Sequence, residues 1–583
     1  MTHGEIREKF LKFFSAKGGP ASGGEGHKIV PSSSLLPTDP SVLFTTAGMQ
    51  QFKPYYTGQG DALTDFGSLN TASIQKSMRT SDIDEVGDES HLTFFEMLGN
   101  FSFGGYFKKE AIGWAHEFIT KEMGLKIDYV SVFGGENPSA DSGQVVPADK
   151  ESEKIWKKVA PGIKVIKAGR EDNFWGPTGD EGPCGPTTEI YVNGLEIWNL
   201  VFNQYYRHPD GRLESLKTPG IDTGMGLDRL AAVVQGKKGV FETDLLEPII
   251  NMTPMELDLR LRRIVTDHSR AIAFLIADGV RPLNKEQGYV LRRLMRRVIT
   301  YNFLAKSDLT LMRDIFAKIV EIYGPFYPNL DANTLIYEFD HEKEKFDKTL
   351  RHGLRELEYL SDIDARSAFR LYESYGLPYE IIKDIAGDKA KSLTREAFEE
   401  EFKKHQEISR AGAEKKFGGH GLLMGLGELG SDLNEEELKK ATRLHTATHL
   451  LHASLRKVLG NEVHQAGSDI TPERLRFDFT FPRKMTPEEI KQVEDMVNEI
   501  TRQDLVVTRE EMSYEDAIKS GAMAFFKLKY PDRVNVYTVG DFSKELCGGP
   551  HVSHSAEIGK FKITKEEAVS AGVRRIRAVV ENP

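Results

Sequence analysis

The sequence has very little cysteine and no long apolar run. Two cysteines in 583 residues exclude a disulfide framework, and we expect a reducing, cytoplasmic location. No run approaches the roughly 18 apolar residues that a membrane-spanning helix needs, so we expect no membrane partner. The first ten residues, MTHGEIREKF, also lack the basic and apolar segments of a secretory signal, and we expect no such signal.

The chain also lacks an excess of positive charge. Its 77 Lys and Arg residues are outnumbered by 88 Asp and Glu residues, which gives a net charge of -11. A nucleic-acid partner would therefore have to bind local basic patches and not the overall field of the protein. Hydrophobic residues make up 39% of the chain, which is enough for buried cores. The length corresponds to about three to five domains.

Regions of different character follow one another along the sequence. Residues 1–244 begin with an amphipathic helix and continue with short apolar strands and many Gly and Pro turns. Residues 245–408 are dominated by long amphipathic helices. A charged, glycine-rich segment at 409–432 is typical of an interdomain linker. Residues 433–583 are mixed again, and the alternation in LRFDFTF (475–481) predicts a strand.

Three histidines and one cysteine form a pattern with metal-binding chemistry. His445 and His449 are four residues apart in a predicted helix, so their rings lie one above the other on one face. With Cys547 and His551 they make a donor set that suits tetrahedral zinc. The other interpretation is histidines that are four apart by chance, and His452 is a decoy in the same helix. The absence of HExxH argues against a metalloprotease but leaves a structural or catalytic metal open.

The amino-terminal region contains neither a P-loop nor a dinucleotide-binding fingerprint. Arg79 and Arg229 instead stand beside strands and turns, and the arginine fork holds phosphate through two hydrogen bonds. Phe95 is a candidate for stacking on a base, and Asp222 for pairing with a cationic amine. Trp175 lies in a Gly- and Pro-rich loop, where large aromatics often wall small pockets. The competing interpretation is core aromatics, surface arginines and a solvated turn aspartate.

A basic helix is predicted at residues 288–301, GYVLRRLMRRVITY. Its apolar positions form one stripe, and four arginines flank that stripe: Arg292, Arg293, Arg296 and Arg297. Two interpretations stay open for this charge. It is either an ordinary solvated face or a patch that contacts a phosphate backbone.

The order of several longer motifs resembles the alanyl-tRNA synthetase family, a family of class II aminoacyl-tRNA synthetases. These motifs include TFFEMLGNFSFGGYF, DNFWGPTGDEGPCGPTTEI, EIWNLVFNQYYR, DTGMGLDR, HTATHLL and CGGPHV, and the resemblance covers essentially the whole chain. It implies an α+β multidomain fold. A class II catalytic domain with an antiparallel sheet and flanking helices would occupy 1–244, a helical tRNA-recognition domain 245–408, and an α+β zinc-containing editing domain 433–583.

The resemblance also implies an activity, an ATP-dependent alanine–tRNA ligase. Alanine would react with ATP in the presence of Mg²⁺ to give alanyl-adenylate, and the acyl group would move to the 3′ end of tRNA(Ala). A small pocket rejects serine and glycine poorly, so a separate site with one Zn²⁺ would hydrolyse Ser-tRNA(Ala) and Gly-tRNA(Ala). Two alternatives stay open: a deacylase that edits in trans with an inactive ligase half, and a non-catalytic RNA-binding module.

Matching motif by motif, the resemblance assigns residues to these roles. The ATP site would contain Arg79, Phe95, Glu96, Gly224 and Arg229. The L-alanine site would contain Trp175, Asn199, Val201 and Asp222, and the catalytic residues would be Arg79, Asp222 and Arg229. The tRNA contacts would be Asn284, Arg292, Arg293, Arg296 and Glu373. Gln465 would belong to the editing site, and His445, His449, Cys547 and His551 would bind the zinc.

The chain departs from the family pattern at a few positions. Glu373 stands where members typically have aspartate, and Pro550 where threonine is common. The chain ends at Pro583, where members commonly continue with a segment that helps dimerise the protein. We therefore expect a monomer.

Overall fold

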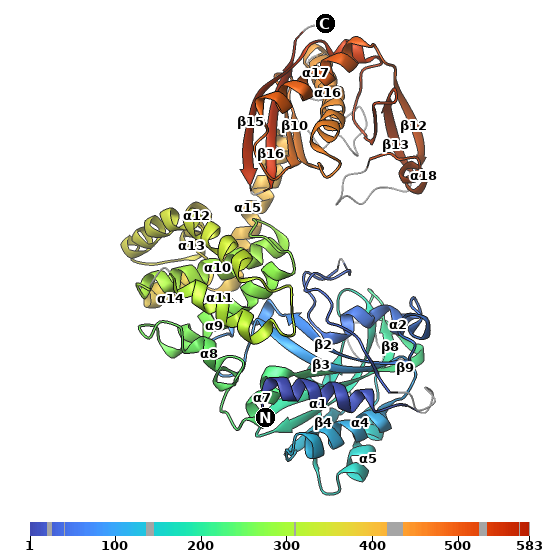
Figure 1. Ribbon diagram of the computed structural model, residues 1–583, viewed down its shortest axis with the longest axis vertical. Coiled ribbons are helices and arrows are strands. Elements are labelled where there is room, and N and C mark those ends of the chain that lie inside the picture. The colour runs from blue at the N-terminus through green and yellow to red at the C-terminus, as the bar shows by residue number, and fades with distance from the viewer. Residues whose placement is uncertain are drawn as a thin grey trace. The chain divides into compact units, whose positions relative to one another are not determined.

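The computed structural model describes residues 1–19, 26–39, 41–135, 145–307, 310–416, 435–523, 533–570 and 572–581. The chain folds into two compact units, Met1–Phe398 and Glu399–Pro583 (Figure 1). The predicted boundary at 244/245 lies inside the first unit. The predicted linker at 409–432 overlaps the end of a helix and then leaves the described residues. Both boundaries stay predictions.

A nine-stranded sheet forms the centre of the first unit. Eight strands follow the order β1-β2-β3-β9-β8-β7-β4-β5, and β6 pairs with β7. The β1–β2 and β4–β5 pairs are parallel and the other pairs are antiparallel. The strands are β1 (Lys28–Ile29), β2 (Asn70–Met78), β3 (Phe94–Ser102), β4 (Tyr129–Phe133), β5 (Lys164–Ala168), β6 (Phe174–Trp175), β7 (Gly182–Val192), β8 (Leu195–Arg207) and β9 (Leu213–Gly226). This largely antiparallel sheet with flanking helices confirms the predicted fold class.

Side-chain alternation gives the sheet two different faces. On β8, Trp198 is fully buried and packs against Phe10 and Phe14 of α1 (His3–Ser15). The alternate residues Asn199 and Val201 point to the opposite face, where they line a cavity. The opening helix is therefore confirmed, and its apolar stripe explains which face of the sheet it covers.

Helices make up the remainder of the first unit. They include α4 (Lys108–Glu117), α5 (Lys150–Val159), α7 (Leu227–Val234), α8 (Glu247–Ile250), α9 (Leu259–Ala277), α10 (Glu286–Leu304), α11 (Leu311–Tyr323), α12 (Ala332–Tyr359), α13 (Ala365–Tyr375) and α14 (Tyr379–Ala386). A further helix, α15 (Arg395–Lys416), begins in the first unit and belongs for most of its length to the second. Phe274 of α9 stacks on Phe94 of β3, with ring centroids 4.0 Å apart. Arg270 of the same helix pairs with Asp228 of α7 at 2.6 Å. The predicted helical region is thus fixed directly to the sheet.

The second unit combines two long helices with two antiparallel sheets. The helices are α16 (Glu435–Leu459) and α17 (Pro487–Arg502), and a short α18 (Tyr514–Lys519) follows. One sheet has the order β10-β11-β16-β15 and the other β12-β13-β14. The strands are β10 (Gln465–Ile470), β11 (Leu475–Thr480), β12 (Val507–Ser513), β13 (Arg533–Val539), β14 (Ser543–Leu546), β15 (Phe561–Ser570) and β16 (Val573–Val580).

The core of this second unit lies between its helices and the four-stranded sheet. Leu450 of α16, Val497 of α17 and Phe477 of β11 are all fully buried in one cluster. β11 is the strand that alternation in LRFDFTF predicts, and that prediction is confirmed. Among the helices of the described residues, none combines the length and the apolar character that crossing a bilayer requires.

Candidate functional site

A cavity of about 320 Å³ opens on the sheet face opposite α1. Several strands and the start of α7 contribute side chains to it, and most of the predicted ATP-site and alanine-site residues line it together. These residues are Arg79, Phe95, Trp175, Asn199, Val201, Asp222, Gly224 and Arg229. The structure therefore brings into one cavity residues that are up to 150 positions apart, counting from Arg79 to Arg229.

Strand register explains why these side chains meet. Val201 on β8 faces Asp222 on β9, and Asn199 faces Gly224 two residues further along. A Cβ atom at Gly224 would lie 2.8 Å from the sulfur of Met97 on β3. Glycine at this position therefore lets β3 and β9 carry their cavity-lining side chains without a clash.

Two arginines and an aromatic ring lie at the end of the cavity where a nucleotide is predicted to bind. The Arg79 guanidinium lies 5.0 Å from the centroid of the Phe95 ring. Arg229 donates to the Glu196 carboxylate at 2.7 Å, which holds its side chain in place. Guanidinium groups clamp phosphate oxygens, and an aromatic face stacks on a base. This geometry suits a nucleoside triphosphate.

Asp222 contributes a buried carboxyl group to the cavity, beside Val201 of the predicted alanine site. Its side chain is 5% exposed, and burial raises its pKa from 3.8 to about 8. Burial is the cause of this rise, and among the described residues no cation offsets it. An isolated buried carboxylate is costly, and a ligand ammonium group would remove that cost. The placement fits the predicted pairing with an amine.

Glu96 is an exception among the predicted ATP-site residues. It lies on β3 between Phe95 and Met97, so alternation points its side chain away from the cavity. There it is fully buried, forms a salt bridge with Arg7 and accepts a hydrogen bond from Tyr327 at 2.5 Å. Burial alone would raise the pKa of Glu96, but the charge of Arg7 outweighs burial and the pKa of Glu96 is lowered. Glu96 therefore does not line this cavity and supports the fold through Arg7, and its place in the ATP site stays a prediction.

We expect Glu96→Gln to destabilise the first unit. The substitution removes the charge that Arg7 pairs with and leaves a buried guanidinium uncompensated, at a cost of about 3–5 kcal/mol. Urea denaturation measures this loss in the free energy of unfolding. Glu8→Gln on the exposed side of α1 is the matched control and should change stability little. Equal stability of the two variants would contradict the structural role.

The arginines of α10 do not form a free basic surface. Arg293 forms salt bridges with Glu380 of α14 and with Asp84, and Arg296 pairs with Glu342 of α12 at 2.8 Å. Arg297 is 1% exposed and contacts the backbone oxygen of Ile83 and the ring of His268. Arg293 and Arg296 are thus ion-paired within the protein, and the tRNA contacts of Arg292, Arg293 and Arg296 stay predictions.

The other two predicted tRNA contacts lie on exposed parts of neighbouring segments. Asn284 precedes α10, and Glu373 lies on α13. Tyr289 of α10 and Tyr372 of α13 have ring centroids 6.4 Å apart, which brings the two segments together. Asn284 and Glu373 can therefore belong to one surface, as the resemblance implies.

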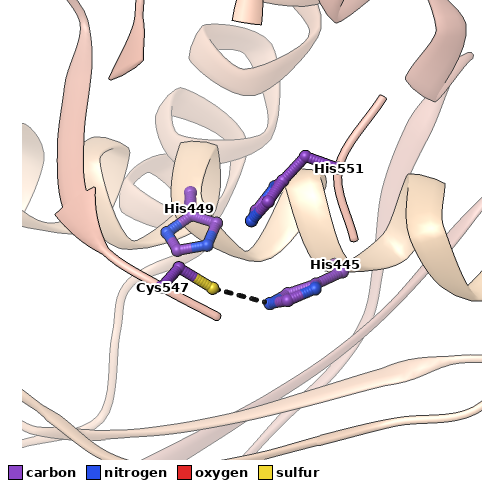
Figure 2. Close-up of side chains that lie close together, drawn as sticks. All are labelled: His445, His449, Cys547 and His551. Atoms are coloured by element: carbon purple, nitrogen blue, oxygen red, sulfur yellow. Dashed lines mark hydrogen bonds between the residues drawn. The ribbon is translucent and has the colours of Figure 1, made fainter. Parts of the chain in front are cut away.

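The second unit brings the predicted zinc donors to one point. Ligand atoms of His445, His449, Cys547 and His551 all lie within 4.8 Å of one another. Figure 2 shows the three rings and the thiol around a common centre, with Cys547 Sγ 3.3 Å from His445 Nε2. His445 and His449 come from successive turns of α16, as the four-residue spacing predicts, and the other pair follows β14.

Outer contacts orient each histidine ring of this cluster. His449 Nδ1 lies 2.5 Å from the Glu545 carboxylate, His445 Nδ1 lies 3.1 Å from the Pro550 carbonyl, and His551 Nδ1 lies 3.2 Å from the Thr446 hydroxyl. The Nε2 atoms of His449 and His551 are buried, and among the described residues they have no hydrogen-bond partner. Zinc-binding histidines are held in this way, with one nitrogen anchored and the other directed at the metal.

The electrostatics of the cluster also suit a metal. Burial lowers the pKa of His551 to about 3, so its ring is neutral and has a lone pair to donate. Burial alone would raise the pKa of Cys547, but His445 and His449 outweigh it and hold that pKa well below its usual value. One thiolate and three imidazoles form a donor set that fits zinc.

Some residues near the cluster have other roles. His452, the decoy, lies 2.9 Å from the same Glu545 carboxylate and is not in the donor cluster. Gln465 begins β10 and donates to Ser468 at 2.9 Å, so its editing role stays a prediction. Glu545 was not predicted. Its position near the end of β14, two residues before Cys547, is the signal that could have identified it.

Comparison with known protein families gives a match in each part of the chain. The family described as tRNA synthetases class II (A) matches residues 5–424. The family described as Threonyl and Alanyl tRNA synthetase second additional domain matches residues 534–577, which include Cys547 and His551.

Curated proteins called alanine–tRNA ligase are similar to the chain over its whole length. The protein of Borrelia hermsii is 44% identical, and the alignment covers 99% of each chain. That of Treponema pallidum is 40% identical over 99% of this chain and 98% of the relative. That of Pseudothermotoga lettingae is 38% identical over 99% of this chain and 80% of the relative.

Proposed function

The chain belongs to the alanine–tRNA ligase family of class II aminoacyl-tRNA synthetases, and from this membership we propose how its two sites divide the work. The cavity of the first unit activates L-alanine with ATP and transfers it to the 3′ end of tRNA(Ala). The metal centre of the second unit hydrolyses Ser-tRNA(Ala) and Gly-tRNA(Ala). Each half of this proposal rests on residues that the fold brings together from distant parts of the sequence.

In the first step the alanine carboxylate attacks the α-phosphorus of ATP. A bond forms between a carboxylate oxygen and that phosphorus, the bond to the bridging oxygen breaks, and pyrophosphate leaves. Arg79 neutralises charge at the α-phosphate, and Arg229 holds the departing end. Asp222 anchors the ammonium group. Because no protein atom forms a covalent bond, positioning and charge stabilisation account for the rate.

We propose that Mg²⁺ enters this cavity with ATP. Glu171 and Asp172 line the cavity and supply carboxylate oxygens, the ligands that Mg²⁺ prefers. The bound ion supplies neutralisation of phosphate charge. The roles of Arg79 and Arg229 do not depend on which carboxylate it contacts.

The zinc centre is proposed for hydrolysis of mischarged tRNA. His445, His449, Cys547 and His551 would hold the ion, and Glu545, Thr446 and the Pro550 carbonyl keep the rings in their orientations. Bound zinc supplies a Lewis acid and a fixed point for the substrate. A cavity that admits alanine cannot strongly reject glycine or serine, which is the physical reason for the second site.

The assembly of Arg79, Trp175 and Asp222 in one cavity is the observation that supports the ligase. Alanine-dependent exchange of pyrophosphate into ATP tests it, because exchange reports adenylate formation without tRNA. We expect exchange with alanine and none without an amino acid. Hydrolysis of Ser-tRNA(Ala) with no exchange would instead favour the alternative, a deacylase with an inactive ligase half. No exchange and no hydrolysis would favour an RNA-binding module.

The pH dependence of alanine binding follows from the Asp222 carboxyl. Burial raises its pKa from 3.8 to about 8, so a falling fraction is ionised below pH 8. The ammonium of alanine binds the ionised form. We expect the KM for alanine in exchange to fall as pH rises from 6 to 8 and to level off above, while the KM for ATP changes little.

The Asp222 carboxyl also affects the stability of the fold. Rising pH favours alanine binding, but it lowers the stability of the protein without alanine. A raised carboxyl pKa stabilises the fold at low pH, and this contribution is lost as pH rises from about 4 through 8. Bound alanine should therefore raise the unfolding temperature most above pH 8. A KM for alanine that is constant between pH 6 and 8 would contradict a raised pKa at Asp222.

Asn284 is proposed to contact the acceptor stem of tRNA(Ala), together with Arg292 and Glu373. We expect Asn284→Ala to raise the KM for tRNA in aminoacylation, because the variant removes a hydrogen-bonding amide at about 1–3 kcal/mol per specific contact. Exchange needs no tRNA and should be unchanged. Asn329→Ala, on the loop after α11, is a control outside the proposed contact. Equal KM values for tRNA would contradict the role of Asn284.

A cytoplasmic location and a monomeric state stay predictions. Both cysteines, Cys184 and Cys547, are free thiols, which suits a reducing compartment. Light scattering at micromolar concentration measures the oligomeric state, and a dimer would contradict the second prediction.

A further inference from the structure

A buried hydrogen-bond network lies directly behind the proposed alanine site. Its centre is Glu189 on β7, which lines the cavity and is 8% exposed. The Ser131 hydroxyl of β4 and the Tyr191 hydroxyl both donate to Glu189 Oε2, at 3.1 and 2.7 Å. The Asn199 amide nitrogen donates to the other carboxylate oxygen, Oε1, at 3.2 Å.

The directions of these hydrogen bonds are fixed by chemistry. The Asn173 amide nitrogen, a donor only, donates to Ser131 Oγ at 2.9 Å. Ser131 accepts that bond, so its own proton points at Glu189. Burial raises the pKa of Glu189, and the Glu196 and Asp172 carboxylates add to that rise, while the hydroxyl bonds from Tyr191 and Ser131 oppose it. Both oxygens of Glu189 face donors, the two hydroxyls at Oε2 and the Asn199 amide nitrogen at Oε1, so Glu189 acts as an acceptor at both. An ionised carboxylate only accepts hydrogen bonds.

Because Glu189 only accepts, Asn199 must turn its amino group toward Glu189 and its carbonyl oxygen away. That oxygen, Asn199 Oδ1, is buried and has no hydrogen-bond partner among the described residues. Asn199 also lines the cavity. An unpaired buried acceptor is costly, and a ligand that donates to it recovers the cost.

We propose that Glu189 is a positioning residue that orients the Asn199 carbonyl to accept a hydrogen bond from the alanine ammonium. Asn199 faces Gly224, and Val201 faces Asp222, so Asn199 and Asp222 are diagonal neighbours on adjacent strands. Such neighbours are about 7–8 Å apart between backbones, which leaves space for one ammonium between two acceptors. This inference rests on the proposed ligase activity. It adds Glu189 to the alanine site as a residue that acts through Asn199.

Glu189→Gln tests the orientation without changing shape. The hydroxyls of Ser131 and Tyr191 keep donating to one end of residue 189, so the carbonyl of glutamine takes that end and its amino group faces Asn199. Asn199 must then present its carbonyl to that amino group and its own amino group to the cavity. Since an amino group repels an ammonium, we expect the KM for alanine to rise by about tenfold to a hundredfold. The kcat at saturating alanine and the KM for ATP should stay within about twofold, because these reflect chemistry and ATP contacts that the variant leaves in place.

A double variant separates orientation from simple structural damage. In Glu189→Gln with Asn199→Asp, the new carboxylate accepts from the glutamine amino group and again offers an oxygen to the cavity. We expect this exchange of amide and acid to recover at least about tenfold in the KM for alanine. Asn199→Asp alone places its carboxylate against that of Glu189, so its KM for alanine should stay above that of the double variant. Glu214→Gln, on an exposed part of β9, is the matched control and should leave exchange unchanged.

The outcomes distinguish the two proposals. Wild-type protein without alanine-dependent exchange would overturn the ligase and, with it, this inference. An active wild type with an unchanged KM for alanine in Glu189→Gln would overturn the inference alone. A double variant no better than Glu189→Gln would do the same, because a residue that only supports the fold predicts no recovery.

Discussion

Asp222→Asn should remove most of the alanine-dependent exchange. The variant keeps the shape of the side chain but removes the buried charge that pairs with the alanine ammonium. Losing one partner of a buried charge pair costs about 2–5 kcal/mol. At 1.4 kcal/mol for each tenfold change, this corresponds to a rise in the KM for alanine of roughly thirtyfold to several thousandfold. Steady-state exchange at increasing alanine concentrations measures it.

The same variant should gain stability in the absence of alanine. Asparagine has no charge to bury, so the cost that raises the Asp222 pKa to about 8 disappears, and the gain in stability grows as pH rises from about 4 and is complete above about 8. Asp210→Asn, in the exposed turn between β8 and β9, should change neither property. A variant that loses activity and also unfolds at lower temperature would indicate a structural aspartate and would contradict the assignment.

Cys547→Ala should remove zinc and serine editing and leave alanine activation intact. The variant takes away the only thiolate of the four donors, so the remaining three histidines bind zinc less tightly than the full set. We expect metal analysis to show loss of zinc. Hydrolysis of preformed Ser-tRNA(Ala) should fall by at least about a hundredfold, which is more than the loss typical of substituting a residue that only hydrogen-bonds a metal ligand. Exchange takes place in the other unit and should be unchanged.

The second cysteine provides a matched control. Cys184 is buried on β7 of the first unit, and Cys184→Ala should keep both zinc and the hydrolysis of Ser-tRNA(Ala). Full zinc content in Cys547→Ala would contradict the proposed donor set. Loss of zinc with normal hydrolysis would leave the ion a structural role and remove it from the chemistry.

Local patterns predicted those features that depend on neighbouring residues. The spacing of His445 and His449 placed both rings on one face of α16, and alternation identified β11. The motifs that resemble the family placed Arg79 and Asp222 in one cavity, although nothing in their spacing required it. The resemblance therefore supplied the long-range information that periodicity lacks.

Contacts with distant elements could not be predicted from sequence spacing. Glu96 is next to a cavity residue, but the alternation of β3 turns it toward Arg7. Arg293 and Arg296 look like a basic patch in sequence, yet α12 and α14 bring carboxylates to them. Glu189 lies within the motif DNFWGPTGDEGPCGPTTEI, but nothing in that motif marks it for a role, because the role depends on strand pairing with Asn199. Pairings of this kind are set by tertiary structure.

Net charging of tRNA(Ala) with serine tests the central claim most directly, because it needs both sites on one RNA. ATP, serine and tRNA(Ala) are given to the wild type and to Cys547→Ala, and Ser-tRNA(Ala) is measured over time. The account predicts that Ser-tRNA(Ala) accumulates with the variant and stays near background with the wild type. Accumulation at equal rates with both proteins, or with neither, would contradict the claim that a ligase cavity and a zinc-held editing site share this chain.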